Sequence, residues 1–183
     1  MIPFPDKKYQ IIYADPAWAY QFGKTSSRFV NNKYAVMTKK EVCELPVRRI
    51  VADNGVLLLW VTYPKLDWAF DVITAWGFEY KTQAFTWIKT NKKTTSLFWG
   101  MGYYTRSNPE VCLLATRGTP LKRLTHSIHS VIMTPIENHS KKPDIVRDKI
   151  VELFGDLSRI ELFARQKTEG WDVWGNEINH ESN

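Results

Sequence analysis

The sequence predicts an α/β fold in which helices lie between the strands of a mostly parallel sheet. Two observations support this class: short apolar segments alternate with longer segments of helical period, and the first apolar run is stopped by a proline. The expected strands are residues 10–14, 56–61, 82–88, 111–116, 130–133 and 159–163. The expected helices are residues 39–52, 65–76 and 143–154.

Local signals mark where the helices begin and end. Thr38 and Glu41 have the spacing of a capping box, so the first helix is expected to begin directly after Thr38. Gly77 follows the second helical segment and provides a stop signal. Pro143 suits the first turn of the third helix, where a missing N–H costs no hydrogen bond.

Composition is that of a globular domain with a basic surplus. Hydrophobic residues make up 44% of the 183 residues, and we expect one domain over residues 1–183. Lys and Arg exceed Asp and Glu by 25 − 19 = 6, which permits a polyanionic partner. Aromatic residues make up 14%, a high content that suits base stacking as well as core packing.

Several classes of protein are disfavoured. Cys43 and Cys112 have no pairing spacing, so we expect neither a disulfide nor a cysteine metal site. His126 and His129 have ligand spacing without further ligands nearby in the sequence, so no metal is expected. The chain shows no leader and no run of membrane-spanning length, which predicts a soluble, cytoplasmic protein without a membrane partner.

The stretch that follows the first strand carries the strongest chemical signal. Ligands of open α/β sheets bind at the carboxyl ends of the strands, and Asp15-Pro16-Ala17-Trp18 stands at such an end. A carboxylate and a backbone carbonyl can both accept hydrogen bonds from one amino group, while an indole stacks on the attached ring. The alternative is a simple Asp-Pro turn followed by a core tryptophan.

This stretch resembles the Asp-Pro-Pro-Trp signature of the MT-A70 family of adenine-N6 methyltransferases. Three further segments resemble family motifs in the same order along the chain. They are residues 139–144 (His-Ser-Lys-Lys-Pro-Asp), 160–165 (Ile-Glu-Leu-Phe-Ala-Arg) and 171–177 (Trp-Asp-Val-Trp-Gly-Asn-Glu). The resemblance implies a Rossmann-like, S-adenosylmethionine-dependent methyltransferase fold with a mostly parallel seven-stranded sheet and helices on both faces. It also implies that the strands within residues 111–133 form an antiparallel pair at one edge.

The resemblance assigns roles to single residues. Asp15, Pro16 and Trp18 are the expected catalytic residues: the Asp15 carboxylate and the Pro16 carbonyl hold the adenine amine, and Trp18 walls or stacks on the base. The expected binding site for S-adenosylmethionine consists of Asp15, Lys142, Arg165, Asn176 and Glu177. Glu110 matches a family acid and is expected to face the target base. The second proline of the signature is Ala17 here, and Lys167-Thr168 replaces a family His-Asn pair.

Two loops are candidates for contact with nucleic acid, residues 19–34 and 90–108. Both combine cations with rings, which suits phosphate contacts and base stacking. The expected substrate-binding residues in these loops are Tyr20, Lys24, Arg28, Lys92, Lys93, Tyr103, Tyr104 and Arg106. For residues 90–108 the alternative is a solvated loop held down by its own aromatic rings.

The resemblance implies an adenine-specific methyltransferase that uses S-adenosylmethionine and acts on DNA. DNA is favoured over RNA because the compact chain is more similar to the small bacterial and phage members than to the long eukaryotic ones. Two alternatives remain: an RNA adenine methyltransferase, and a catalytically silent partner subunit that binds nucleic acid. The retained Asp15 and Trp18 argue against the silent subunit. The sequence leaves open a homodimer or a partner subunit.

Overall fold

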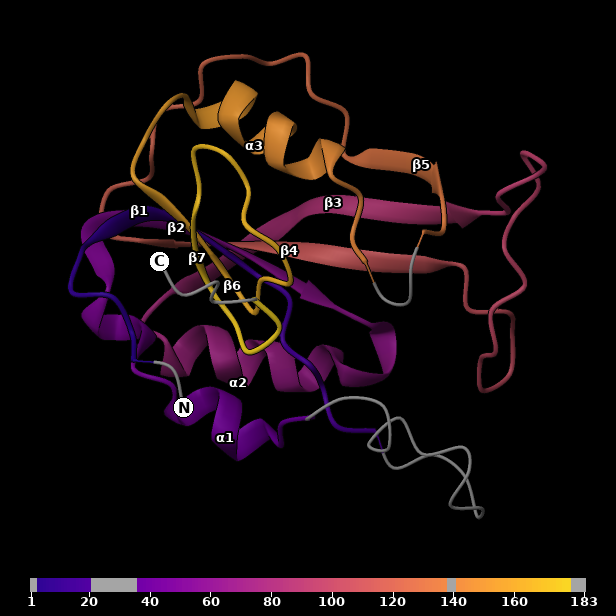
Figure 1. Cartoon of the computed structure of the whole chain (residues 1–183), viewed down its shortest axis with the longest axis horizontal. Helices are drawn as coiled ribbons and strands as arrows, with labels where there is room; N and C mark the ends of the chain where they lie inside the picture. The colour runs from indigo at the N-terminus through magenta and orange to yellow at the C-terminus, as the bar shows by residue number, and fades with distance from the viewer. Residues whose placement is uncertain (1–2, 21–35, 138–140, 179–183) are drawn as a thin grey trace.

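The computed structural model describes residues 3–20, 36–137 and 141–178. Within these ranges, seven strands form one sheet in the order β5-β3-β4-β2-β1-β6-β7 (Figure 1). The strands are β1 (Tyr9–Ala14), β2 (Val51–Val61), β3 (Glu79–Thr90), β4 (Pro109–Arg117), β5 (Val131–Pro135), β6 (Arg159–Leu162) and β7 (Asp172–Trp174). The α-helices are α1 (Lys39–Glu44), α2 (Leu66–Ala75) and α3 (Ile145–Phe154), and Val47–Arg49 and Tyr63–Lys65 form short 3₁₀ turns.

The sheet is mostly parallel, as the sequence predicts. β4 is antiparallel to both of its neighbours, β2 and β3. The other pairs (β1 with β2, β1 with β6, β6 with β7 and β3 with β5) are parallel. Among the described strands, all but β4 therefore run in one direction, and their carboxyl ends lie at the same edge of the sheet.

Helices cover both faces of the sheet, which confirms the predicted architecture (Figure 1). Alternation along the central strands divides the core: Ile12 and Leu57 pack with α1 and α2 on one face, whereas Ile11 and Leu58 pack with α3 on the other. Strands that are buried on both faces have continuous apolar sequences, which is why the sequence alone predicts β1 and the apolar part of β2. None of the helices within the described ranges has the length and apolar composition needed to cross a membrane.

The first predicted helix is wrong beyond Glu44. Thr38 and Glu41 do form the expected capping box. The helix ends at Leu45, whose ψ of 136° is not helical. Leu45 precedes Pro46, and the proline ring disfavours helical backbone angles in the residue before it. After Pro46 and a 3₁₀ turn, β2 begins at Val51, inside the segment that the sequence analysis assigns to the helix.

The expected antiparallel pair at the sheet edge is also wrong. β4 is antiparallel but lies inside the sheet between β3 and β2, and the edge strand β5 runs parallel to β3. β3 and β4 are joined by residues 91–108, so the chain turns back on itself there. It then returns through residues 118–130 before β5 begins, and this return makes β5 parallel to β3.

The sequence analysis also misses β7 as a strand. Its three residues are too few to show alternation, and only tertiary pairing with β6 defines it. β2 also begins at Val51, five residues before the predicted residue 56, whereas the remaining boundaries lie within three residues of the prediction. α2 is followed by Gly77 with a φ of +83°, as expected for a helix stop. Pro143 lies just ahead of α3 and accepts a hydrogen bond from Val146 N–H at 3.1 Å.

A buried ion pair fixes α3 on the sheet. The Arg147 guanidinium of α3 donates two hydrogen bonds to the Glu161 carboxylate of β6, at 2.7 and 2.8 Å. It also donates to Asp144 at 2.7 Å, at the start of the helix. Together these contacts of Arg147 set the position of the segment before α3, which carries Lys142.

Arg147→Met should destabilise the protein by about 3–5 kcal/mol, because it leaves the Glu161 carboxylate buried without its partner. Urea unfolding followed by circular dichroism would measure this loss. The double variant Arg147→Met/Glu161→Leu should recover most of the stability, since it removes both charges. Equal stability of the wild type and the single variant would show that the pair does not hold α3.

Candidate active site at the carboxyl edge of the sheet

One cavity of about 490 Å³ opens at the carboxyl edge of the sheet. Its lining includes residues 15–18 after β1, Thr62 after β2, residues 163–165 after β6 and residues 174–177 at the end of β7. Because β4 runs in the opposite direction, the beginning of this strand contributes Glu110 to the same edge. Open α/β sheets bind their ligands at this edge.

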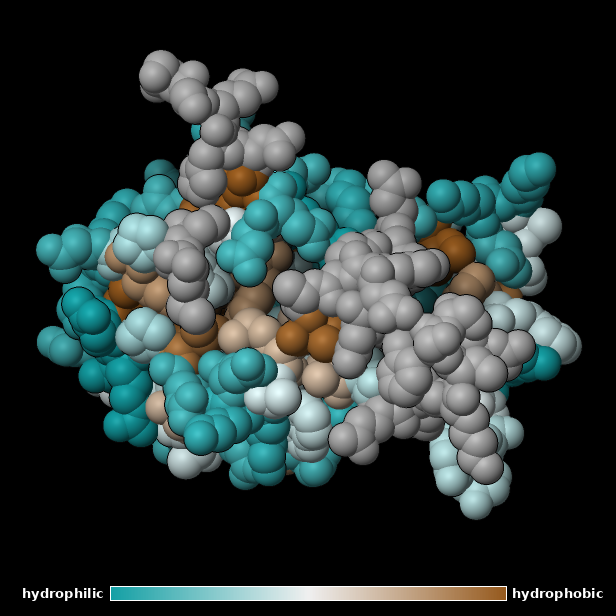
Figure 2. All heavy atoms as spheres, turned by 60° about the horizontal axis from the view of Figure 1, so that its bottom comes forward, coloured by the Kyte–Doolittle hydropathy of each residue, from teal (hydrophilic) through white to brown (hydrophobic). Residues whose placement is uncertain are grey.

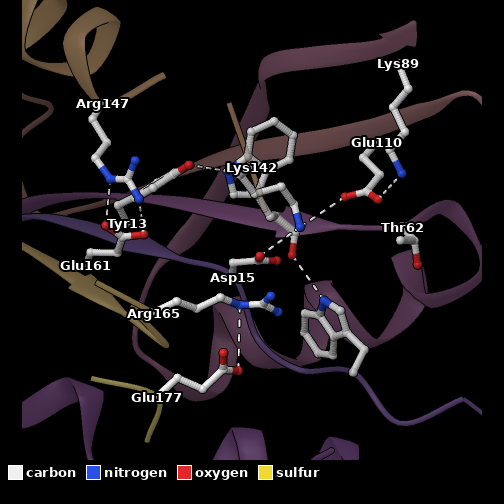
Figure 3. Close-up of polar contacts among 12 residues, drawn as sticks. Tyr13, Asp15, Thr62, Lys89, Glu110, Lys142, Arg147, Glu161, Arg165 and Glu177 are labelled. Carbon is white, nitrogen blue, oxygen red and sulfur yellow. Dashed lines mark hydrogen bonds and ion pairs between the residues drawn. The ribbon is translucent and has the colours of Figure 1, made fainter. Parts of the chain in front are cut away.

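Charged side chains of alternating sign gather in this cavity (Figure 3). Lys142 Nζ donates to Asp15 Oδ2 at 2.8 Å and lies 3.2 Å from Glu110 Oε2. Glu110 also forms an ion pair with Lys89, at the end of β3. Two acids and two cations therefore share a largely buried site, and their formal charges balance.

The surroundings shift the pKa of each of these charged groups. Burial raises the pKa of the Asp15 carboxyl above its usual range, and Lys142 only partly offsets this. Burial would also raise the pKa of Glu110, but Lys142 and Lys89 together hold it below its usual range. Burial opposes the charge of Lys142, yet the two carboxylates raise its pKa above that of an ordinary lysine. The surroundings thus move the pKa values of the two acids in opposite directions.

The second acceptor next to Asp15 is the carbonyl of Pro16. It accepts the Trp18 backbone N–H at 2.9 Å, which closes a tight turn and leaves a second lone pair on the oxygen. The Trp18 indole is nearly buried in the core and donates to the Trp60 carbonyl at 3.2 Å. Trp18 therefore combines the two interpretations from the sequence: it is a core residue, and one side of it lines the cavity.

The opposite side of the cavity is formed by the ends of β6 and β7. Arg165 Nε lies 3.7 Å from Glu177 Oε1 (Figure 3). Asn176 also lines the cavity. Gly175 is required here, since a Cβ at this position would meet the Ala164 carbonyl oxygen at 2.2 Å. Phe163 has a φ of +63°, an uncommon backbone conformation for a bulky residue. The two strand ends are thus packed tightly against each other at the cavity.

Tyr20 joins the cavity from the loop after the signature. Its hydroxyl and that of Thr62 form a hydrogen bond, and burial raises the pKa of Tyr20 to about 12. The backbone after the signature is held by Met37, whose N–H donates to Ala17 O at 2.8 Å and whose carbonyl accepts from Ala19 N–H. This pairing keeps the turn after Pro16 in place although Ala17 stands where the family signature has a second proline.

Residues 91–108 form a projecting arm between β3 and β4 (Figure 1). Its base is closed by hydrogen bonds, among them Phe98 N–H to Lys89 O at 2.9 Å. Trp99, Tyr103 and Tyr104 are 71%, 80% and 94% exposed, so these rings do not hold the loop down. At the right of Figure 2, where the arm extends from the molecule, hydrophilic residues lie next to apolar ones. Arg106 stacks on Trp99 with its guanidinium carbon 4.5 Å from the ring centroid.

The structure thus divides the predicted site residues into three groups. The first group lines the cavity and consists of Asp15, Pro16, Trp18, Tyr20, Glu110, Lys142, Arg165, Asn176 and Glu177. The second lies on the exposed arm, outside the cavity lining, and consists of Lys92, Lys93, Tyr103, Tyr104 and Arg106. Lys24 and Arg28 form the third group and lie outside the described residues.

Sequence reasoning missed Thr62, Phe163 and Lys89. Each directly follows an expected strand or ends it, and all three lie at the carboxyl edge. Their position at a strand end is the signal that could have identified them, although it does not show which side chain turns inward. Within the described residues, no group of three His, Cys, Asp or Glu side chains could hold a metal ion.

Comparison with known proteins agrees with the motifs and the fold. The MT-A70 family model matches residues 9–177. The chain is 36% identical to the Type II methyltransferase M.MunI of a Mycoplasma species, with 95% of this chain and 79% of that protein covered. It is 26% identical to the human N(6)-adenosine-methyltransferase catalytic subunit METTL3, with 93% of this chain but 28% of METTL3 covered.

A further relative is the N(6)-adenosine-methyltransferase MT-A70-like protein of Drosophila melanogaster, which is 27% identical over 93% of this chain and 27% of its own length. The chain therefore spans less than a third of these two animal relatives but most of M.MunI. The family match covers nearly the whole described fold, and it includes all the strand ends that form the cavity. The chain belongs to the MT-A70 family of adenine-N6 methyltransferases, whose members use S-adenosylmethionine as the methyl donor.

Proposed function

We propose that this protein methylates the exocyclic N6 amine of adenine in DNA, with Asp15, Pro16 and Trp18 as its catalytic residues. The observation that carries the proposal is the pair of acceptors in one cavity, the Asp15 carboxylate and the Pro16 carbonyl. The lone pair of an adenine amine is delocalised into the ring, so the amine is a poor nucleophile. Two acceptors that hold its N–H bonds favour the more tetrahedral nitrogen that methyl transfer needs.

Asp15 can accept from Lys142 and from the amine at the same time, because a carboxylate has about four lone-pair positions. Its negative charge stabilises the positive charge that develops on the nitrogen. Lys142 orients the carboxylate from one side. Trp18 forms a wall for the base, and its indole is fixed by the hydrogen bond to the Trp60 carbonyl.

The cavity fits S-adenosylmethionine in size and in chemistry. Its volume of about 490 Å³ lies within the roughly 300–1,000 Å³ of typical small-molecule and cofactor sites. Glu177 suits a ribose diol, Arg165 and Asn176 suit neighbouring polar groups, and the Lys142 ammonium suits a carboxylate. When bound, the cofactor supplies an activated methyl group on a positive sulfonium.

DNA is favoured over RNA by the pattern of similarity. The relative at 36% identity is named a Type II methyltransferase, a designation used for enzymes that modify DNA. The two relatives named N(6)-adenosine-methyltransferase, METTL3 and the Drosophila protein, are 26% and 27% identical. The cavity is recessed at the sheet edge, so the target base must leave its stack to reach Asp15.

The arm supplies the surface for the nucleic acid next to the target base. It begins directly after the strand end that carries Lys89 and returns to Glu110 in the cavity. Lys92, Lys93 and Arg106 provide charge for phosphates, and the exposed rings of Trp99 and Tyr104 provide stacking surfaces.

Asp15→Asn should lower kcat by about 100-fold or more at saturating S-adenosylmethionine, because it removes the charge of a preorganised acceptor while keeping its shape. Transfer of a labelled methyl group to an adenine-containing oligonucleotide would measure the change. Asp71→Asn removes an exposed carboxylate paired with Lys39 and should leave kcat unchanged. Wild-type turnover by a folded Asp15→Asn protein would contradict the mechanism.

Matched DNA and RNA oligonucleotides should be methylated at different rates, with kcat/KM higher for DNA. Methylation is expected to be faster on single strands or mismatched duplexes than on perfect duplexes, since an unpaired base leaves the stack at lower cost. Mass spectrometry of the digested products would identify N6-methyladenine in each substrate. A clear preference for RNA would refute the DNA assignment but not the adenine chemistry.

Lys92→Ala/Lys93→Ala should weaken DNA binding and reduce the slope of log affinity against log salt by about 2, one unit for each lost phosphate contact. Fluorescence anisotropy with a labelled oligonucleotide at several salt concentrations would measure the slope. Lys122→Ala/Arg123→Ala is the matched control, because it removes the same charge from the loop after β4, at the opposite end of that strand. Equal slopes for the two double variants would exclude the arm as a DNA contact.

A further inference from the structure

Lys89 lies next to the site without being part of the cavity wall. Glu110 and Lys142 line the cavity, whereas Lys89 is absent from the lining and reaches the site only through its ion pair with Glu110 (Figure 3). Its side chain is only 18% exposed, so the pair is not a solvated surface contact. Lys89 can therefore influence the site only through the Glu110 carboxylate.

Lys89 is the outermost member of a chain of alternating charges, Lys89–Glu110–Lys142–Asp15. The side chains of Glu110 and Lys142 are 12% and 11% exposed, and that of Asp15 is 22% exposed. Interactions between charges are screened weakly in such surroundings. A change of charge at Lys89 is therefore transmitted along the chain.

The geometry shows what Lys89 does for Lys142. The Lys142 ammonium is shared unequally, at 2.8 Å from Asp15 and 3.2 Å from Glu110. Glu110 is already neutralised by Lys89, so it competes only weakly for Lys142. Without Lys89, the Glu110 carboxylate would draw Lys142 away from Asp15, because a buried carboxylate needs a partner.

The backbone of Lys89 also closes the base of the arm. Its N–H donates to the Asn108 carbonyl at 3.1 Å, and its carbonyl accepts from the Phe98 N–H at 2.9 Å. Asn108 lies two residues before Glu110 and also donates its side-chain N–H to the Phe98 carbonyl. One residue thus links the charges of the cavity to the root of the arm.

We propose that Lys89 is a positioning residue for methyl transfer: its pairing with Glu110 keeps Lys142 on Asp15 and so keeps the Asp15 carboxylate oriented toward the adenine amine. This inference rests on the proposed role of Asp15 as the acceptor for that amine. Lys89 itself does not touch the substrate or the methyl donor. Its effect therefore falls mainly on kcat, as expected for an interaction made in the transition state, and KM for S-adenosylmethionine changes only through Lys142, whose ammonium also suits the carboxylate of the donor.

Lys89→Met tests the proposal, since it removes the charge and keeps a side chain of similar length. We expect kcat to fall roughly tenfold to a hundredfold, because a small displacement of a catalytic group can cost about that much. Lys89→Arg should restore most of kcat. Lys89→Gln, which can donate a hydrogen bond to Glu110 without a charge, should resemble Lys89→Met and serves as a second variant if Lys89→Met does not fold.

The pH profile gives a readout that a purely structural role would not change. Four titratable groups face Glu110: Lys89 on β3, Lys142 in the segment before α3, Asp15 after β1, and Tyr20. When Lys142 moves from Asp15 toward Glu110, Asp15 loses the cation that lowers its pKa, so the acid limb of kcat should move to higher pH in Lys89→Met and stay in place in Lys89→Arg. Carbon-13 NMR of the Asp15 and Glu110 carboxyls in the protein without ligands measures this shift directly, together with the rise in the Glu110 pKa that follows removal of the Lys89 cation.

Lys7→Met is the matched control, because Lys7 forms an exposed ion pair with Asp172 at the start of β7, at the opposite end of that strand from the cavity. It should change neither kcat nor the Glu110 pKa. Wild-type kcat in a folded Lys89→Met protein, or an unchanged Glu110 pKa, would overturn the inference about Lys89. Absence of adenine methylation by the wild type would instead refute the proposed function, and the NMR measurement would still decide whether Lys89 controls Glu110.

Discussion

The contact between Lys142 and Asp15 is the interaction on which the candidate site depends. It joins two segments that are 127 residues apart in the sequence, at 2.8 Å, and it holds a cation and an acid in a cavity where neither charge is stable alone. Glu110 adds a third segment to the same ammonium. The bidentate pair of Arg147 with Glu161 supports this arrangement, since it fixes the helix that directly follows Lys142. The chemistry of the cavity therefore depends on the Lys142–Asp15 pair at the edge of the sheet and on the Arg147–Glu161 pair that supports it.

The sheet order explains why such distant segments meet. β1 lies between β2 and β6, so the residues after β1 have the ends of both neighbours beside them. The reversed direction of β4 brings the beginning of that strand, with Glu110, to the edge where the other strands end. The long connection between β3 and β4 consequently leaves the molecule at the same edge and becomes the arm. A single reversed strand thus places the acid, the arm and the acceptor motif together.

The division of the cavity follows from the same topology. The end of β1 and the beginning of β4 bring acids and Lys142 to one side, and the ends of β6 and β7 bring Arg165, Asn176 and Glu177 to the other. The close approach at Gly175 and the left-handed backbone at Phe163 show how tightly the second side is built. We interpret the first side as the place of the target base and the second as the place of the methyl donor, with Lys142 serving both ligands. Methyl transfer requires these two ligands to meet between the two sides.

The sequence by itself determined the fold class, the signature at Asp15 and the order of the motifs, because continuous apolar runs and Gly or Pro punctuation are local properties of the chain. It did not determine the parallel edge strand β5 or the short strand β7, since pairing across the sheet decides these features. The end of α1 at Leu45, in contrast, has a local cause in Pro46, where the predicted helix should have stopped. It also named Glu110 and Lys142 separately, without their shared contact, and it did not identify Lys89 at all. Charges on residues 89, 110 and 142 have no local pattern in common. Only the folded sheet brings them within reach of one another, and only there does burial make each charge depend on the next.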